Sequence, residues 1–129
     1  MLKPETHFLI VDDYSTIRNL VTSQLLDFGF SGNFSEAENV DEAIEIMGET
    51  PVDFIISDWN MPGKTGFEFL KWVRAQDKYA KLPFLILTTE NEQEKILDAI
   101  SEGASNFLLK PWEEEDLSEK IQLAFQQHN

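Results

Sequence analysis

The chain has 129 residues, of which 42% are hydrophobic and 26% are charged, a composition typical of one globular domain. It contains no cysteine, which excludes disulfides, cysteine-ligated zinc and thiol catalysis. The net charge of -14 argues against a nucleic-acid partner, because nucleic acids bind basic faces. The sequence shows neither a signal peptide nor an apolar run of about 20 residues, so we expect no membrane contact and a cytoplasmic location.

Short apolar runs alternate with amphipathic segments five times along the chain. The apolar runs predict strands over residues 8–11, 34–37, 54–57, 84–87 and 106–109. The segments that follow them predict five helices, of which the first covers residues 15–28 and the third covers residues 66–75.

The first helix should begin with Ser15 as its N-cap and should end before Gly29. A period of 3.6 residues predicts one apolar stripe along this helix, directed at the core. The stripe consists of Ile17, Leu20, Val21, Gln24, Leu25 and Phe28.

Capping residues mark the other helices. Asn39 and Glu42 have capping-box spacing at the start of the second helix, and Thr65 suits a cap in the loop before the third. The fourth helix should begin near Asn91 and end at Gly103. The apolar faces predicted for the second, fourth and fifth helices are Val40, Ala43, Ile44 and Met47, then Ile96, Leu97 and Ile100, then Leu117, Ile121, Ala124 and Phe125.

The first, third, fourth and fifth strands are continuous apolar runs, a pattern typical of strands that are buried on both faces. The alternation of strands and helices predicts an α/β fold, in which a doubly wound five-stranded parallel sheet is covered by five helices on its two sides. The sequence has no linker, repeat or low-complexity segment. We therefore expect a single domain over residues 1–129, without an attached effector domain.

Polar side chains follow the predicted strands at one edge of this sheet. Asp12 and Asp13 follow the first strand, Asp58 ends the third, Thr88 follows the fourth and Lys110 follows the fifth. Ligands of open parallel sheets bind outside the carboxyl ends of the strands, and three clustered carboxylates repel one another unless a cation is present. The set therefore predicts a Mg²⁺ site, with Lys110 as the counter-charge for a phosphate group.

With these residues in these places, the sequence resembles the receiver domain of two-component response regulators, and especially the single-domain chemotaxis members of that family. The likeness runs from about residue 7 to residue 125. It is carried by Thr88 and by the segments FLIVDD at 8–13, SDWNMP at 57–62, GAS at 103–105 and KPW at 110–112. The resemblance implies a flavodoxin-like sheet with the strand order 2-1-3-4-5.

The resemblance also implies the roles of the acidic residues. Asp58 would be the phosphoacceptor, which is the nucleophile that becomes an aspartyl phosphate. Asp13 and Asp58 would hold Mg²⁺ together with the backbone carbonyl of Asn60, while Asp12 assists through a water molecule, and Mn²⁺ could replace Mg²⁺. A loose phosphoryl transition state needs positioning and charge neutralisation more than covalent help, which such a site supplies.

The family further implies a conformational switch. Thr88 would donate its hydroxyl to the phosphoryl group, and Lys110 would pair with a phosphoryl oxygen beside a cis Lys110–Pro111 peptide. Phe107 occupies the position whose ring turns inward as Thr88 moves, although it lacks the hydroxyl of the tyrosine usual in the chemotaxis members. Thr89 also departs from the family, because a smaller residue is frequent there. We expect phosphorylation alone to shift the equilibrium partially and a partner to complete the shift.

Expected partners follow from the same resemblance. A histidine kinase would donate the phosphoryl group, and an output protein or peptide would bind the altered surface, with the flagellar motor switch as one candidate. A phosphatase is a further candidate, and we expect the protein to be a monomer. The predicted partner surface, on the fourth helix, fifth strand and fifth helix, consists of Asn91, Gln93, Ile96, Phe107, Trp112, Glu114 and Lys120.

We expect a signalling protein and not an enzyme, with at most self-phosphorylation and self-dephosphorylation. Asn60 and Glu90 should flank the path along which water attacks the aspartyl phosphate. Neither side chain forms an apolar lid, so the phosphorylated form should be short-lived.

Other interpretations compete with this one. The chain could be a receiver in another phosphorelay or in a stress pathway. A phosphoaspartate hydrolase of the haloacid dehalogenase type needs a second acid two residues after the nucleophile, where this chain has Asn60. A flavodoxin-like electron carrier shares the sheet order, but Asp12 and Asp13 would repel a flavin phosphate. A degenerate receiver that acts only as a binding module usually lacks the acceptor or the lysine, and this chain has both Asp58 and Lys110.

Overall fold

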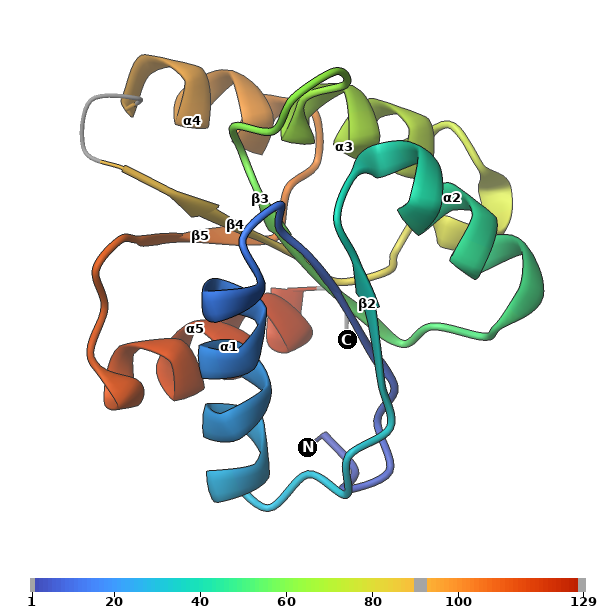
Figure 1. Ribbon diagram of the computed structural model, residues 1–129. Coiled ribbons are helices and arrows are strands. Elements are labelled where there is room, and N and C mark those ends of the chain that lie inside the picture. The colour runs from blue at the N-terminus through green and yellow to red at the C-terminus, as the bar shows by residue number, and fades with distance from the viewer. Residues whose placement is uncertain (1, 90–92, 128–129) are drawn as a thin grey trace.

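The computed structural model describes residues 2–89 and 93–127. Its centre is one parallel five-stranded sheet in the order β2-β1-β3-β4-β5 (Figure 1), so the predicted fold class and strand order are confirmed. Within the described part of the chain, no helix combines the length and the apolar character that crossing a membrane would require. The strands are β1 (Phe8–Val11), β2 (Phe34–Ala37), β3 (Phe54–Asp58), β4 (Phe84–Thr88) and β5 (Asn106–Leu109).

In the described residues, five α-helices and one short 3-10 helix accompany the strands, and the helices form a layer on each side of the sheet (Figure 1). One layer contains α1 and α5, and the other contains α2, α3 and α4. The bounds are α1 (Ser15–Asp27), α2 (Val40–Glu49), α3 (Gly66–Arg74), η1 (Asp77–Tyr79), α4 (Gln93–Ser101) and α5 (Glu114–Gln127).

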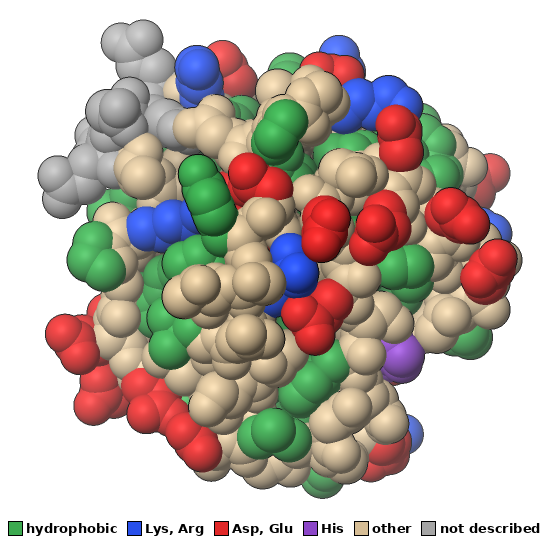
Figure 2. Space-filling model, in the orientation of Figure 1, with side chains coloured by type: hydrophobic (Ala, Val, Ile, Leu, Met, Phe, Trp, Pro, Cys, Tyr) green, Lys and Arg blue, Asp and Glu red, His purple; other side chains and the backbone are tan. Residues whose placement is uncertain are grey.

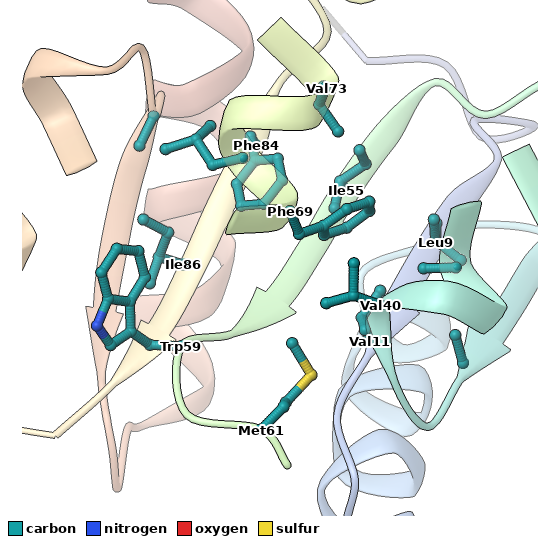
Figure 3. Packing of buried hydrophobic residues seen from close by; sticks show 14 of the residues in the cluster. Leu9, Val11, Val40, Ile55, Trp59, Met61, Phe69, Val73, Phe84 and Ile86 are labelled. Carbon is teal, nitrogen blue, oxygen red and sulfur yellow. The ribbon is translucent and has the colours of Figure 1, made fainter. Parts of the chain in front are cut away.

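The two layers explain why the central strands are apolar throughout. Successive strand residues point to opposite faces, so Leu9 and Ile55 join the core under α2, α3 and α4, which Figure 3 shows. Their neighbours Ile10 and Ile56 join the second core, under α1 and α5. The prediction of burial on both faces is wrong for β5, where only Leu108 is fully buried, because β5 is an edge strand that pairs with β4 alone.

The two ends of α1 differ in how well the sequence predicted them. Ser15 is the first helical residue and not the N-cap, which is Tyr14. The Tyr14 amide donates a hydrogen bond to Asp12 Oδ1 at 2.9 Å. Gly29 ends the helix as predicted, with a φ of +99°. That left-handed conformation suits glycine, and it allows the Phe30 amide to donate to the Leu25 carbonyl at 3.2 Å.

Three apolar residues predicted for the core lie at the surface instead. Leu20 on α1 is 43% exposed, and Leu97 on α4 is 70% exposed. Ile100 on α4 is also exposed. On α1 the inward place three residues before Val21 is taken by Arg18, which is only 8% exposed. The core stripe of each helix is therefore narrower than the apolar pattern indicated.

Asn39 and Thr65 cap α2 and α3. The capping box predicted for α2 forms only in part, because the Glu42 side chain accepts from the Glu38 amide, at 3.4 Å, in place of the Asn39 amide. The Asn39 side chain accepts a hydrogen bond from the Glu42 amide at 2.8 Å. Thr65 caps α3 in a reciprocal capping box, in which each side chain of the Thr65–Glu68 pair accepts from the other residue's amide. Asn91, the predicted cap of α4, lies outside the described residues.

Gly66, the first residue of α3, lies against the chain beside the end of β3. A Cβ at Gly66 would stand 2.5 Å from the Asp58 carbonyl oxygen and 2.9 Å from the Trp59 Cα. Both atoms belong to backbone that cannot rotate away, so this position requires glycine. In contrast, a Cβ at Gly48 in α2 would meet nothing within 4 Å.

Replacing these two glycines by alanine should therefore have opposite effects. Gly66→Ala should lower the free energy of unfolding by about 1–3 kcal/mol, as overpacking does. Gly48→Ala should raise it by about 0.5–1 kcal/mol, because alanine is the better helix former. Urea denaturation followed by circular dichroism measures both, and a Gly66→Ala variant as stable as Gly48→Ala would contradict the close approach.

Candidate functional site

The carboxyl ends of the strands bring three acidic side chains together. Asp12 and Asp13 follow β1, and Asp58 is the last residue of the adjacent strand β3, where Val11 pairs with Ser57. One carboxylate oxygen from each acid lies within 4.8 Å of one from both others. The convergence that the sequence predicted is therefore present in the fold.

Lys110, which follows β5, reaches into this cluster from the far edge of the sheet. Its Nζ lies 2.9 Å from Asp58 Oδ1 and 3.4 Å from Asp12 Oδ2. The Lys110 amide donates to the Thr88 carbonyl at 2.7 Å, which extends the β4–β5 ladder to the site. The Lys110–Pro111 peptide is cis, as predicted. One ammonium group thus contacts two of the three carboxylates.

Among the described residues, hydrogen bonds reach one of the two carboxylate oxygens of Asp58. Oδ1 accepts from Lys110 Nζ and from the Trp59 amide, each at 2.9 Å. Oδ2 accepts no hydrogen bond from any residue that the structure describes. Asp58 as a whole is only 5% exposed. Its Oδ2 is nevertheless not fully buried, so solvent reaches this oxygen.

Burial sets the direction of the pKa shifts of the two acids Asp12 and Asp58. Burial raises the pKa of Asp58, although the hydrogen bond and charge of Lys110 oppose it. Burial also raises the pKa of Asp12, where the Tyr14 amide and Lys110 act in the opposite direction. Above about pH 4 the unfolded chain has released the protons of these two acids, whereas the native protein still holds them. Without a cation, the free energy of unfolding therefore falls as pH rises from about 4 through the raised pKa values of Asp12 and Asp58. Burial lowers the pKa of Lys110, but Asp58 and Asp12 outweigh it and raise that pKa overall.

Asp13 gives the clearest indication that the acidic cluster suits a cation. Its Oδ1 is buried and has no hydrogen-bond partner among the described residues. A buried carboxylate oxygen without a partner is costly, and a hard cation would remove that cost. Carboxylate oxygens are the ligands that Mg²⁺ and Mn²⁺ prefer, so the three acids fit such an ion. Asp12 is fully buried and already accepts from Tyr14 and Lys110, which leaves Asp13 and Asp58 as the better direct ligands.

Thr88 and Phe107, the predicted switch residues, lie on the same face of neighbouring strands. Ile86 pairs with Phe107 and Thr88 pairs with Leu109, and side chains two residues apart share a face. Thr88 is buried, whereas Phe107 is half-buried against the core of α2, α3 and α4. The Nζ of Lys120 lies 5.5 Å from the centre of the Phe107 ring.

The predicted partner surface is only partly present as a surface. Ile96 is 3% exposed, so its place on that surface is wrong: it points inward with Ala99, one helical turn away. Trp112 is half-buried and its Nε1 donates to Gln24 Oε1 on α1 at 2.8 Å. Glu114 is exposed and Lys120 is half-buried. Glu90 and Asn91 lie outside the described residues, and the side chain of Gln93 is likewise not described.

Sequence reasoning missed two residues next to the site. Arg18 donates to the Asp12 carbonyl from Nη1 at 2.5 Å, and Gly66 packs on the backbone of Asp58 and Trp59. Arg18 could have been found from periodicity, since it stands three and seven residues before Val21 and Leu25, on the inward stripe of α1. No pattern in the sequence singles out Gly66, because its close approach depends on the path of the loop.

The mutual repulsion of the acids leads to a test on Asp13. Asp13→Asn removes one of three close negative charges, and no described residue donates to its Oδ1. In the presence of a chelator, the free energy of unfolding of the variant should exceed that of the wild type by on the order of 1 kcal/mol. Saturating Mg²⁺ should stabilise the wild type and should leave the variant unchanged. Urea denaturation with chelator and with Mg²⁺ measures both effects, and equal Mg²⁺ stabilisation of the two proteins would argue against a cation at Asp13.

Comparison with known proteins agrees with this geometry. The chain is 38% identical to the chemotaxis protein CheY of Pseudomonas aeruginosa over 121 residues, which cover 94% of this chain and 97% of that protein. It is 36% identical to the chemotaxis protein CheY-3 of Vibrio cholerae over 126 residues, or 98% of this chain and 96% of that protein. The structure of the chemotaxis response regulator CheY4 of Vibrio cholerae matches with a TM-score of 0.84 and 39% identity, over 93% of this chain and 98% of the other. The response regulator receiver domain matches residues 8–122, and the chain therefore belongs to the response regulator receiver domain family.

Proposed function

We propose that this chain is a response regulator receiver that accepts a phosphoryl group on Asp58 from a histidine kinase. The observation that carries the proposal is the state of the Asp58 carboxylate. Lys110 and the Trp59 amide hold Oδ1, each at 2.9 Å, while no described residue donates to Oδ2. The nucleophile is thereby oriented through one oxygen and available at the other. Membership of the receiver domain family supports the same role.

The transfer forms one bond and breaks another. Asp58 Oδ2 attacks the phosphorus of a phosphohistidine, the P–N bond breaks, and the imidazole leaves with the bonding electron pair and takes up a proton. The transition state is loose and spreads negative charge over the peripheral phosphoryl oxygens, so the site has to position and neutralise them. Lys110 stands within reach of those oxygens, since its Nζ already contacts Asp58 and Asp12.

The acidic residues have a second task, which is to hold a divalent cation. A Mg²⁺ or Mn²⁺ ion ligated by Asp13, Asp58 and the Asn60 carbonyl, with Asp12 acting through water, would neutralise charge on the transferred group. The chain itself keeps the carboxylates close together and half shielded from water, at the cost of raised pKa values for Asp12 and Asp58. A nearby cation favours their ionised forms and offsets that cost.

Phosphorylation would then rearrange the contacts around Lys110 and Thr88. A phosphoryl group adds close to two negative charges, so Lys110 would exchange carboxylate oxygens for phosphoryl oxygens, and Thr88 would turn its hydroxyl toward them. Because Thr88 and Phe107 share one face of the sheet, movement of Thr88 makes room for the ring to turn inward. The ring would give up its cation–π contact with Lys120, which is worth about 0.5–1 kcal/mol at an exposed site.

The output surface would be the one formed by α4, β5 and α5. Curated relatives of this chain are named chemotaxis proteins, so we infer a role in chemotaxis, with the flagellar motor switch as a candidate partner. Leu97 and Ile100 on α4 are exposed, so their apolar side chains would contact the partner in place of Ile96. The acidic residues 113–116, at the start of α5, favour a partner with basic side chains.

The lifetime of the aspartyl phosphate would depend on the residues beside the path of the attacking water. Asn60 is exposed, two residues after the acceptor, and it offers no apolar cover. Glu90 is the second residue proposed to flank this path. The phosphorylated form should therefore decay quickly, by self-dephosphorylation or with help from a phosphatase.

Labelling with acetyl phosphate tests the proposed acceptor. In the presence of Mg²⁺, the wild type should gain the mass of one phosphoryl group, and base should release it because an aspartyl phosphate is an acyl phosphate. Asp58→Asn should gain none, since an amide oxygen is a poor nucleophile. Asp77→Asn, which changes an acid of η1 away from the strand ends, is the matched control and should label like the wild type. Persistent labelling of Asp58→Asn would place the acceptor on another residue.

A further inference from the structure

Arg18 is a buried arginine that contacts the backbone of the acidic cluster. It lies on α1, is 8% exposed, and donates from Nη1 to the backbone carbonyl of Asp12 at 2.5 Å. Within the described part of the chain, no hydrogen bond or ion pair joins Arg18 to any of the three carboxylates at the strand ends. Its place is therefore beneath the acidic loop and not among the groups that would contact the phosphoryl group.

The other side of the guanidinium is anchored on the neighbouring strand. Nε donates to Glu36 Oε1 on β2 at 3.0 Å, and Nη2 lies 3.9 Å from Glu38 Oε1. A guanidinium is planar and rigid, so donors held at one end fix the direction of the donors at the other. Glu36 and Glu38 also offset much of the positive charge of Arg18. Arg18 therefore influences the site more through the position of its donors than through its charge.

The bond from Arg18 fixes the peptide group between Asp12 and Asp13. The Asp12 carbonyl and the Asp13 amide belong to the same planar unit, so the Arg18 bond sets the plane from which the Asp13 side chain leaves. The amide of Asp12 is held separately, by donation to the Ala37 carbonyl at 3.1 Å. Asp13 Oδ1 has no described hydrogen-bond partner that could orient it. Its direction thus depends on the backbone that Arg18 holds.

We propose that Arg18 is a positioning residue for the divalent cation site, and that it acts by holding the Asp12–Asp13 peptide so that Asp13 Oδ1 points at the ion. The inference rests on the proposed function, because it assumes a cation at Asp13 and Asp58. Arg18 itself binds neither the ion nor the phosphoryl group. Residues that orient metal ligands typically change metal affinity by about 10–100-fold when they are removed.

Geometry and charge predict opposite results when Arg18 is replaced. If Arg18 influenced the ion only through its charge, removing that charge would reduce repulsion and would strengthen Mg²⁺ binding. If Arg18 positions Asp13, removing its bond to the Asp12 carbonyl weakens binding. The sign of the change in Mg²⁺ affinity therefore separates the two roles, and a loss of global stability alone would produce neither in a protein that remains folded.

Isothermal titration calorimetry with Mg²⁺ on the unphosphorylated protein measures this affinity. Arg18→Met should weaken Mg²⁺ binding roughly tenfold, the lower end of the range for orienting residues. Arg74→Met is the matched control, since half-buried Arg74 also donates to two backbone carbonyls, those of Gly103 and Tyr79 at 2.9 and 3.0 Å. The Arg74→Met variant loses the same charge and similar hydrogen bonds, but away from the carboxyl ends of the strands. Its Mg²⁺ affinity should therefore equal that of the wild type.

Circular dichroism establishes that each variant is folded at the temperature of the titration. Should Arg18→Met not fold, Arg18→Lys replaces it. Lysine keeps the charge but lacks the rigid planar group that links Asp12 to Glu36, so Mg²⁺ binding should again weaken, by roughly threefold, less than for loss of the whole side chain. Unchanged or tighter Mg²⁺ binding by the folded variant would overturn the role of Arg18 while leaving the proposed function intact. Absence of Mg²⁺ binding by the wild type would overturn both.

Discussion

The contact of one ammonium group with two buried carboxylates is the interaction on which the rest of this structure depends. Lys110 lies 2.9 Å from Asp58 and 3.4 Å from Asp12, but a third acid, Asp13, keeps a buried oxygen without a described partner. The cluster is therefore short of positive charge in the state described here. Burying unpaired charge is costly, and a site that retains such charge is a candidate ligand-binding site.

The sheet makes this unbalanced cluster stable enough to exist. Cores on both faces hold the strands rigidly, and the acids stand at the strand ends where ligands of such sheets bind. Figure 2 shows further acidic side chains gathered over the side of the molecule that carries α2, so the surroundings add negative charge. A cation bound here would relieve this repulsion, and a phosphoryl group on Asp58 would give Lys110 a new partner. Under the proposed function, the same imbalance would favour metal binding and would make phosphorylation a conformational signal.

Much of this could be predicted from the sequence, and the exceptions have physical reasons. All five strands and the convergence of Asp12, Asp58 and Lys110 followed from apolar runs and from the residues at their ends, because parallel sheets fix where strand ends meet. The buried face of α4 could not be predicted, since the spacing of Ile96, Leu97 and Ile100 does not show which of them faces the sheet. Arg18 was overlooked because composition treats arginine as a surface residue, whereas here two glutamates and a carbonyl satisfy it.

Anomalous diffraction from crystals grown with Mn²⁺ tests the central claim most directly. Mn²⁺ takes the same oxygen ligands as Mg²⁺ and scatters anomalously, so the map locates the ion without reference to any model of the site. The account predicts a peak between Asp13 and Asp58, bonded to a carboxylate oxygen of each and to the carbonyl of Asn60. A map from fully loaded crystals with no peak at these acids, or with its main peak elsewhere, would contradict the account.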